Sequence, residues 1–441
     1  MSQVTLQQVL QAREDRVRLQ RQILQDHGCP IICFTMNIAG PIKNSPLIQR
    51  GFQEGLHALA MQLPAESVRK YCVDSSITGC QAMYAVNMDA SELKHICTSI
   101  EESTPLGRLF DMDVLDVNGT KLERNDLRGC IVCGAAGRTC AAGRIHTVSQ
   151  LQAVTTRILR DHLMQVDAEQ IASTAVQSLI DEVHTTPKPG LVDRRNSGSH
   201  TDMDIRHFIA SANSLKPYFK ECFKIGQDTA ALLPQETFSL LRQAGLTAEK
   251  TMYQATGGVN THKGVIYTMG VLCGSIGRLW TPESPIAENA AIVSECARIV
   301  SNSIDSDFAS ADSSTAGLQL YRKHGIKGIR GEVAAGLPSV TGISLPAYKD
   351  GLSKGFSPND AGAVTLLHLI AKVKDTNLYH RGGCEGAAWA AESAQMLLQA
   401  ASYPSIQSIA ELDDSFIAQN LSPGGCADLL AVTYFLHSLN P

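Results

Sequence analysis

Hydrophobic residues recur with a helical period at the start of the chain. Residues 3–27 place apolar side chains near the spacing of one helix face, and Gly28 follows as a stop signal. Residues 47–63 return to the same spacing. The pattern therefore predicts two amphipathic helices in the first part of the chain.

Two short runs in this part have the composition of strands. Residues 30–41, PIICFTMNIAGP, are rich in β-branched and aromatic side chains and end at Gly40 and Pro41. Residues 106–119, LGRLFDMDVLDVNG, alternate apolar and polar positions with the period of a half-buried strand. We therefore predict an α+β fold for the first part.

From about residue 150 the pattern changes to that of helices. Residues 148–165 and 166–185 are rich in Ala and Leu at helical spacing, and later segments continue in the same way with few strand signals. The second part is therefore predicted to be an all-α helical domain. We place the boundary between domains 1–165 and 166–441, because 441 residues are enough for two separate cores.

Composition narrows the classes of function. The chain has 18% charged residues and a formal net charge of -5, which argues against a nucleic-acid binder. Its first residues are polar, and no uncharged apolar run of about 18 residues follows, so we expect a cytoplasmic protein without a membrane segment. Thirteen cysteines are an odd number spread over a long chain, which indicates reduced thiols.

Residues 107–113, GRLFDMD, place an arginine and two carboxylates on the second predicted strand. Arg108 can contact phosphate, and Asp111 and Asp113 share one strand face because they are two positions apart. Such a pair can hold Mg²⁺, which neutralises a triphosphate during in-line attack on phosphorus. The glycine followed by paired aspartates resembles nucleotidyltransferases, so we expect a fold of that kind. The alternative is a pair of exposed strand carboxylates without a ligand.

Four residues with zinc-binding side chains follow in the order C-x2-C-x6-C-x5-H. They are Cys130, Cys133, Cys140 and His146, the ligand types of a structural zinc site with a compact spacing. The alternative is a set of reduced thiols in a glycine-rich loop, in which Arg138, Arg144 and His146 are available to phosphate.

The second domain gathers polar groups beside glycine at five places. They are residues 186–204 (TPKPGLVDRRNSGSHTDMD), 256–264 (TGGVNTHKG), 328–340 (GIRGEVAAGLPSV), 375–383 (DTNLYHRGG) and 421–431 (LSPGGCADLLA). Most lie at a predicted helix end, where the helix dipole and free backbone N–H groups favour anions. Cationic side chains suit phosphate, and carboxylates suit a divalent metal. Each segment is also compatible with an ordinary helix-capping loop.

At these motifs the chain resembles known enzymes. The five segments of the second domain are similar, in the same order, to the triphosphoribosyl-dephospho-coenzyme-A synthases of the citrate lyase and malonate decarboxylase systems. In the first domain FTMNIAGPIK, the turn at Thr78 and Gly79, GRLFDMDV and C-x2-C-x6-C-x3-R-x-H resemble the holo-acyl-carrier-protein synthase of citrate lyase, a phosphoribosyl-dephospho-coenzyme-A transferase. The chain thus resembles a fusion of the two, although residues 137–146, GRTCAAGRIH, are richer in Gly and Ala than that family's basic stretch.

The resemblance implies two successive reactions. In the second domain, the ribose 2′-hydroxyl of 3′-dephospho-coenzyme A would attack C1 of the ATP ribose and expel adenine. In the first domain, a serine of the apo-acyl carrier protein of citrate lyase would attack the α-phosphorus of that product and release pyrophosphate. ATP, dephospho-coenzyme A and the carrier protein are the implied partners, and Mg²⁺ is the expected cofactor.

Physical chemistry then assigns trial roles. Carboxylates would stabilise the developing oxocarbenium charge and take the hydroxyl proton, and the candidates are Asp202, Asp204, Glu332 and Asp375. Asp202 and Asp204 are also expected to hold Mg²⁺, and His262 or His380 would protonate the departing adenine. The groups expected to bind nucleotide are Lys188, Arg194, Asn260, Lys263, Arg330 and Arg381, with Arg108 and Arg144 in the first domain.

Three other interpretations stay open at this point. The chain could serve the carrier protein of malonate decarboxylase, or its second domain could hydrolyse the glycosidic bond of ATP without an acceptor. It could also be a regulatory module that binds coenzyme A or ATP without turnover. The last interpretation predicts that no adenine forms from ATP and dephospho-coenzyme A.

Overall fold

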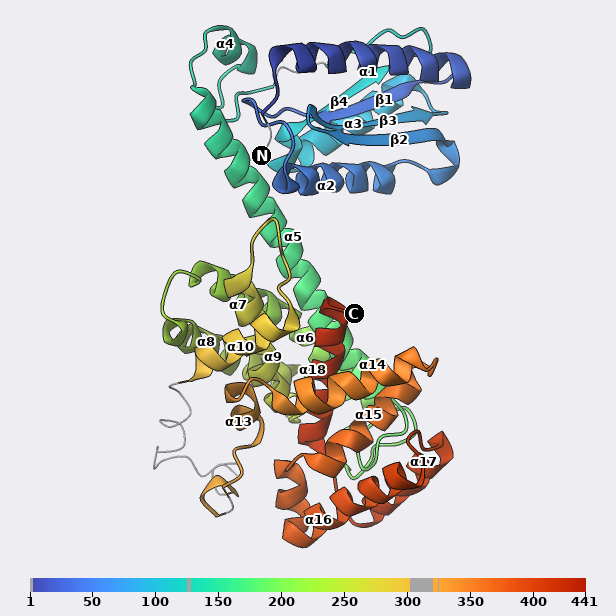
Figure 1. The fold of residues 1–441 in the computed structure, drawn as a ribbon, viewed down its shortest axis with the longest axis vertical. Helices are drawn as coiled ribbons and strands as arrows, with labels where there is room; N and C mark the ends of the chain where they lie inside the picture. Colours follow the sequence, from blue (N-terminus) through green and yellow to red (C-terminus); the bar gives the residue numbers. More distant parts are fainter. Residues whose placement is uncertain (1–2, 125–127, 302–319, 324) are drawn as a thin grey trace. The chain divides into compact units, whose positions relative to one another are not determined.

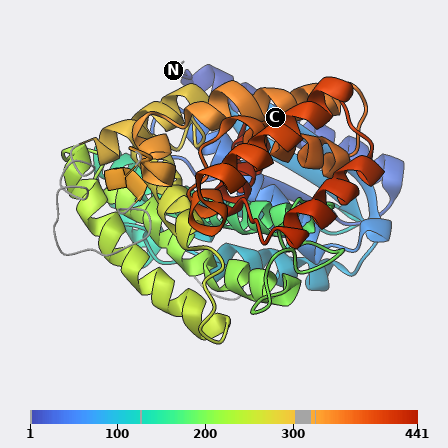
Figure 2. The same ribbon diagram turned by 90° about the horizontal axis from the view of Figure 1, so that it is seen from below.

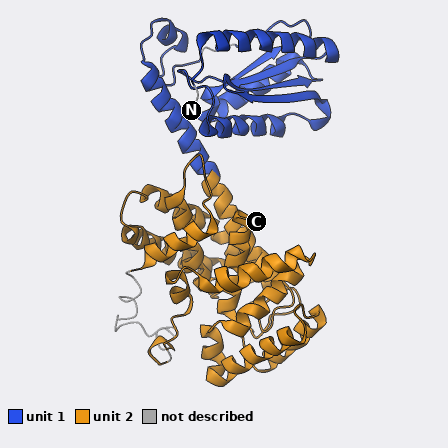
Figure 3. Cartoon of the chain, in the orientation of Figure 1, with its two compact units in different colours: residues 1–166 blue, residues 167–441 orange. Residues whose placement is uncertain are grey.

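The computed structural model describes residues 3–124, 128–301, 320–323 and 325–441. It divides into two compact units, residues 1–166 and residues 167–441 (Figure 3). Unit 1 contains a small sheet with helices, and the described part of unit 2 is mostly helical. The two-part architecture predicted from the hydrophobic pattern is therefore confirmed.

Unit 1 is organised around one antiparallel sheet with the strand order β2-β3-β1-β4. The strands are β1 (Ile31–Met36), β2 (Val68–Ser76), β3 (Gly79–Val86) and β4 (Phe110–Leu115). In the register of the sheet, Ile31 of β1 pairs with Ala85 of β3 and with Leu115 of β4. The apolar run predicted as a buried strand thus lies inside the sheet.

Helices cover both faces of this sheet (Figure 1). They are α1 (Leu6–His27) on one face and α2 (Pro46–Gln62) with α3 (Ala90–Ser103) on the other. Ile31 packs with Ile23 of α1, whereas Phe34 stacks on Phe52 of α2 with ring centroids 4.6 Å apart. Because successive strand side chains point to opposite faces, a continuous apolar run in β1 serves both layers.

The strand predicted within residues 106–119 is shorter in the structure. Leu106–Leu109 form the 3₁₀ turn η2, and β4 begins only at Phe110. Along β4 the buried residues Met112 and Val114 alternate with Asp111 and Asp113, so the two carboxylates share a strand face as predicted. Two further helices follow, the short α4 (Gly137–Ala142) and the long α5 (Val148–His184), which continues into unit 2.

Unit 2 is built from helices, and no β-strand occurs in its described residues. Besides the end of α5 they are α6 (Ile205–Ser214), α7 (Lys216–Asp228), α8 (Pro234–Ala255), α9 (Lys263–Leu279), α10 (Asn289–Val300), α13 (Gly328–Ala334), η3 (Val340–Ser344), α14 (Leu345–Ser353), α15 (Pro358–Lys372), α16 (Thr376–Ala400), α17 (Ile406–Ala418) and α18 (Gly424–Leu439). The helix before residues 186–204 ends at His184, ahead of Pro187 and Pro189, as the sequence predicted.

The core of unit 2 lies around α9 and α18. The C-terminal helix α18, red in Figure 2, contacts α9, α14, α15 and α16. A Cβ atom on Gly277 of α9 would lie 2.0 Å from the carbonyl oxygen of Phe223 on α7, so only glycine permits these helices to pack this closely. Among the described helices, none combines the length and the apolar character that a membrane span requires.

Candidate active sites

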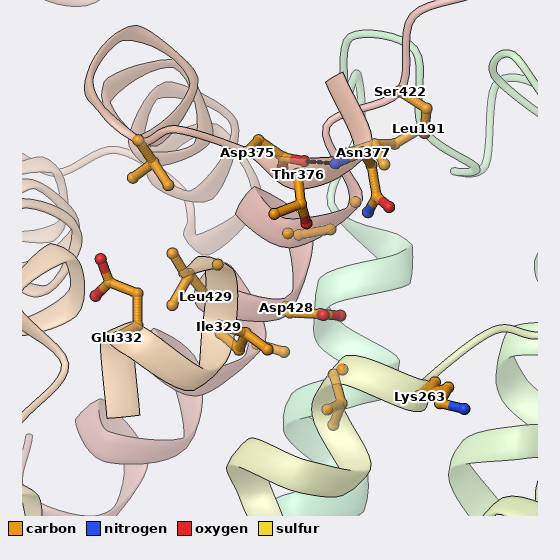
Figure 4. A pocket seen from close by; sticks show the side chains of 18 of the residues that line it. Leu191, Lys263, Ile329, Glu332, Asp375, Thr376, Asn377, Ser422, Asp428 and Leu429 are labelled. Carbon is orange, nitrogen blue, oxygen red and sulfur yellow. Dashed lines mark hydrogen bonds between the residues drawn. The ribbon is translucent and has the colours of Figure 1, made fainter. Parts of the chain in front are cut away.

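Unit 2 contains a cavity of about 850 Å³ at which several helices begin. Its lining includes Lys263 at the start of α9, Gly328 at the start of α13, Thr376 at the start of α16 and Gly424 at the start of α18. Figure 4 shows residues from all four helices around this cavity. The first turns of a helix offer free backbone N–H groups and the positive end of the dipole. The cavity therefore suits a polyphosphate.

Cationic side chains add to this positive potential. Those that line the cavity are Lys263, Lys327, Lys372, Lys374 and Arg381. Arg381 is anchored by hydrogen bonds to the carbonyl oxygen of Ser199 and to Oδ1 of Asn420, both at 2.9 Å. Within the described residues no ion pair reaches the three lysines 327, 372 and 374, so their charges are available to a ligand.

Asp428 is a carboxylate at this cavity that lies within the predicted segment 421–431 but was assigned no role from the sequence. It lies in the first turns of α18, where Figure 4 shows it close to the start of α9. A Cβ atom on Gly264 would come within 2.0 Å of Asp428 Oδ2, and no hydrogen bond or ion pair reaches this carboxylate within the described residues. Burial, with the neighbouring Glu182 and Asp375, raises the pKa of Asp428 well above its ordinary value.

Two carboxylates that were predicted from the sequence also line the cavity, and both have protein partners. Glu332 accepts hydrogen bonds from the Ser339 hydroxyl at 2.7 Å and from its backbone N–H at 3.1 Å. Asp375 caps α16 by accepting from the Asn377 N–H and also accepts from the Cys426 N–H of α18, each at 2.7 Å. Asp375 thus joins two helix starts, while Asp428 has no such task.

Two histidines predicted as acids also line the cavity but differ in their surroundings. His262 is buried, with Nδ1 2.7 Å from the Ser211 hydroxyl and Nε2 without a hydrogen-bond partner among the described residues. Burial, with a smaller effect of Lys188, lowers the pKa of His262 to about 3, so the imidazole is neutral at physiological pH. His380 is exposed on the first turns of α16.

Of the predicted nucleotide-binding residues, Asn260, Lys263 and Arg381 line this cavity. Lys188 lies behind the wall, fully buried in an ion pair with Glu182, which itself lines the cavity. Arg194 donates to Oδ1 of Asn359 at 3.0 Å and is not part of the lining.

Three more predicted residues lie outside the lining. Asp202 is exposed, and Arg330 is placed 6.0 Å from the ring centroid of Tyr267. Asp204 is the N-cap of α6, accepts from the Arg206 N–H at 2.9 Å and forms an ion pair with the Arg206 guanidinium at 2.7 Å. The roles assigned to these residues from the sequence stay predictions.

A second cavity, of about 840 Å³, lies in unit 1. The predicted residues that line it are Arg108, Asp111, Asp113, Cys130, Cys140, Arg144 and His146. Four further cations, which the sequence patterns did not indicate, also line this cavity: Lys94, Lys121, Arg124 and Arg128. Lys121 pairs with Asp113 at 2.7 Å, and Arg128 pairs with Glu101 at 2.9 Å.

The electrostatics of this second cavity centre on the two aspartates of β4. Burial, and then the charge of Asp113, raises the pKa of Asp111 above its ordinary value. Two neighbouring carboxylates that repel each other favour a divalent cation between them, and their oxygen atoms are the donors that Mg²⁺ prefers. Asp111 and Asp113 therefore fit the predicted magnesium site by position and chemistry.

Comparisons with known proteins agree with this division of the chain. Residues 168–441 match the family model for ATP:dephospho-CoA triphosphoribosyl transferase (CitG), and residues 4–162 match that for apo-citrate lyase phosphoribosyl-dephospho-CoA transferase (CitX). Protein CitXG of Haemophilus influenzae is 35% identical over 99% of this chain and 97% of its own length. Protein CitXG of Leuconostoc mesenteroides is 31% identical with the same coverage.

Another relative is named for the triphosphoribosyl-dephospho-coenzyme-A synthase activity. The 2-(5''-triphosphoribosyl)-3'-dephosphocoenzyme-A synthase of Klebsiella pneumoniae is 38% identical over 62% of this chain and 91% of its own length. The resemblance carried by the sequence motifs is therefore confirmed. The chain belongs to the CitXG family, in which a CitX transferase region is followed by a CitG triphosphoribosyl transferase region.

Proposed function

We propose that this chain makes the prosthetic group of citrate lyase and attaches it to the carrier protein. Unit 2 joins ATP to 3′-dephospho-coenzyme A and releases adenine. Unit 1 transfers the phosphoribosyl-dephospho-coenzyme-A group to a serine of the apo-acyl carrier protein and releases pyrophosphate. The family of both regions supports these activities. The observation that carries the proposal is the cavity of unit 2, where helix starts and lysines meet a carboxylate without a protein partner.

In unit 2 the cationic groups hold the triphosphate and leave the ribose to react. Lys327, Lys374 and Arg381 provide positive charge at the cavity, and the helix starts provide backbone N–H donors. The new bond forms between the acceptor 2′-oxygen and C1 of the ATP ribose, and the bond from C1 to adenine breaks. Positive charge develops on the ribose in the transition state, so a carboxylate near C1 lowers the barrier.

Asp428 is the group that we assign to this role. Its carboxylate has no protein partner within the described residues and a raised pKa, so it can both face a cationic ribose and accept the hydroxyl proton. Glu332, oriented by Ser339, is the second carboxylate available to the acceptor. His380 is the better donor of a proton to the leaving adenine, because the lowered pKa of His262 leaves its imidazole neutral.

In unit 1 the serine hydroxyl of the carrier attacks the α-phosphorus, and pyrophosphate leaves. Arg108 and Arg144 contact phosphate oxygens from the cavity wall. Asp111 and Asp113 would hold Mg²⁺, which supplies charge neutralisation at the phosphates. This arrangement is the nucleotidyltransferase-like chemistry that GRLFDMD indicates.

A magnesium site at Asp202 and Asp204 of unit 2 lacks comparable support. Both oxygens of Asp204 already accept hydrogen bonds from Arg206 or His207, and Asp202 is outside the cavity lining. We therefore assign no step of the reaction to these two residues. Because ATP and dephospho-coenzyme A are cytoplasmic metabolites, we expect the protein to act in the cytoplasm.

Mass spectrometry tests the proposal directly. The protein with ATP, Mg²⁺ and dephospho-coenzyme A should release adenine and form 2′-(5″-triphosphoribosyl)-3′-dephospho-coenzyme A. Addition of the apo-carrier of citrate lyase should then give a carrier heavier by the phosphoribosyl-dephospho-coenzyme-A group, and faster than the carrier of malonate decarboxylase. Release of ADP or AMP, with adenine still joined to ribose, would refute the reaction. Absence of any product would favour a regulatory binding module.

A further inference from the structure

The loop that follows β4 in unit 1 brings four metal-binding side chains together. One donor atom from each of Cys130, Cys133, Cys140 and His146 lies within 4.8 Å of every other. Cys133 Sγ is 3.5 Å from Cys140 Sγ and 3.2 Å from His146 Nε2. In a tetrahedral site with Zn–S near 2.3 Å and Zn–N near 2.0–2.1 Å, these separations would be about 3.8 Å and about 3.6 Å. The two separations at Cys133 are thus within about 0.4 Å of those that a tetrahedral zinc site requires.

The local backbone supports metal binding as well. The Val132 N–H donates to Cys130 Sγ at 3.4 Å, a contact that stabilises a thiolate. Gly134 N–H donates to the Cys130 carbonyl oxygen at 2.9 Å, so the turn between the first two cysteines is closed. A tight turn of this kind directs both cysteine side chains to the same point.

Ile131 packs against the core of unit 1, but the rest of this loop buries little apolar surface. Its helix, α4, has six residues, and Cys140 is the one buried side chain in it. Cys133 and Ile145 are exposed. Short segments with so little buried apolar surface commonly depend on a metal or a disulfide to stay folded.

We propose that Cys130, Cys133, Cys140 and His146 bind one zinc ion in a closed site that fixes the wall of the unit 1 cavity. Three thiolates and one imidazole fill all four positions, so the site is structural and leaves none for substrate. The cavity lining contains Arg138 and Arg144. Arg138 lies two residues before the third cysteine, and Arg144 lies between that cysteine and the histidine. Zinc would therefore fix the part of the loop that carries these phosphate-binding arginines.

Metal analysis of the full-length protein tests the site without reference to activity. Protein purified without chelator under reducing conditions should contain about one zinc per chain by mass spectrometry, as one tetrahedral site requires. Cobalt substitution should give the thiolate-to-cobalt charge-transfer band and the strong visible bands of a tetrahedral sulfur site. Protein without zinc that also gives no such cobalt spectrum would overturn the proposal.

Variants assign the ligands. Cys133→Ser should lose most of the bound zinc, whereas His146→Cys should keep it, because four thiolates also form a tetrahedral zinc site. Cys384→Ser is the matched control, since Cys384 is an exposed cysteine on α16 outside this cluster, and it should keep the zinc. Retention of full zinc content in Cys133→Ser would contradict the assignment.

The part of the proposal in which zinc positions the cavity wall rests on the proposed function, and it is tested by the rate of carrier modification. Removal of zinc by a chelator should slow carrier modification by about tenfold or more, while adenine release in unit 2 stays unchanged. Re-addition of zinc should restore the rate. If zinc is present but its removal changes neither carrier modification nor protease cleavage of residues 128–147, the metal does not fix the wall. A failure of the proposed reaction would leave the zinc stoichiometry unaffected.

Discussion

Replacement of Asp428 by asparagine separates the chemistry of unit 2 from its stability. The change keeps the shape of the side chain and removes its negative charge. Within the described residues, the Asp428 carboxylate forms no hydrogen bond or ion pair that the change would break. It lies instead against the first turn of α9 and near the carboxylates of Glu182 and Asp375. We therefore expect Asp428→Asn to fold normally.

The expected decrease in the rate of adenine release follows from the two catalytic roles assigned to the Asp428 carboxylate. A general base contributes about 10²–10⁴-fold to a rate, and one preorganised electrostatic contact contributes about 10²–10³-fold. We expect the rate of adenine release to fall by about 10²–10⁴-fold, which corresponds to about 3–5 kcal/mol in the barrier. Binding of ATP, which depends on the lysines and helix starts, should change little.

The same substitution, Asp428→Asn, should lower the rate but should not lower the stability of the fold. The pKa of Asp428 is raised in the folded protein, so this group lowers the free energy of unfolding at every pH above the pKa that it has in the unfolded chain. As the pH falls through the raised pKa, the folded protein takes up the proton before the unfolded chain does, and the free energy of unfolding rises. Asp428→Asn should lack this rise, and at neutral pH its melting temperature should equal or exceed that of the parent.

The assay is adenine release at saturating ATP and dephospho-coenzyme A, followed by chromatography. Asp204→Asn is the matched control, because Asp204 caps α6 outside the cavity and should keep most of the activity. If Asp204 had the catalytic role predicted for it from the sequence, Asp204→Asn would lose more activity than Asp428→Asn. Comparison of the two variants therefore decides which carboxylate is catalytic. A loss of less than about tenfold in Asp428→Asn, under 1.4 kcal/mol, would refute the assignment of Asp428.

Three further predictions concern other parts of the structure. Asp111→Asn should stop carrier modification while adenine release continues, and loss of both activities would contradict the assignment of the two reactions to separate units. Lys188→Met leaves Glu182 buried without its partner and should lower the free energy of unfolding, measured with denaturant, by about 3–5 kcal/mol. The double variant Lys188→Met/Glu182→Gln should recover most of that loss. Equal stability of the single variant and the parent would show that the ion pair is unimportant. Gly277→Ala places a methyl group 2.0 Å from the Phe223 carbonyl oxygen and should destabilise the protein by about 1–3 kcal/mol. Gly245→Ala on α8 is the control: its new Cβ would have its nearest neighbour at 3.5 Å, and it should stabilise the protein by about 0.5–1 kcal/mol. A similar effect of both substitutions would refute the close packing of α7 on α9.

Local sequence determined most of the elements and the chemical character of both sites. The apolar period predicted α1 and α2, and the prolines after residue 186 placed the end of α5, because these signals act within a few residues. The i, i+2 spacing of Asp111 and Asp113 likewise placed both on one face of β4, since strand alternation is a local rule. The long motifs of the second domain were sufficient to identify its family.

Tertiary structure alone decided which polar residues meet. The starts of α9, α16 and α18 are far apart in the chain and converge on one cavity through the packing of α9 and α18, which no local pattern encodes. For the same reason local sequence does not distinguish Asp204 from Asp428, since both are acidic residues near the start of a helix. In the fold, Asp204 has Arg206 and two backbone N–H groups within three residues, whereas Asp428 faces the cavity beside Gly264. Side-chain partners close in sequence can be predicted, but a carboxylate that has no partner is recognised only when every neighbour in space is known.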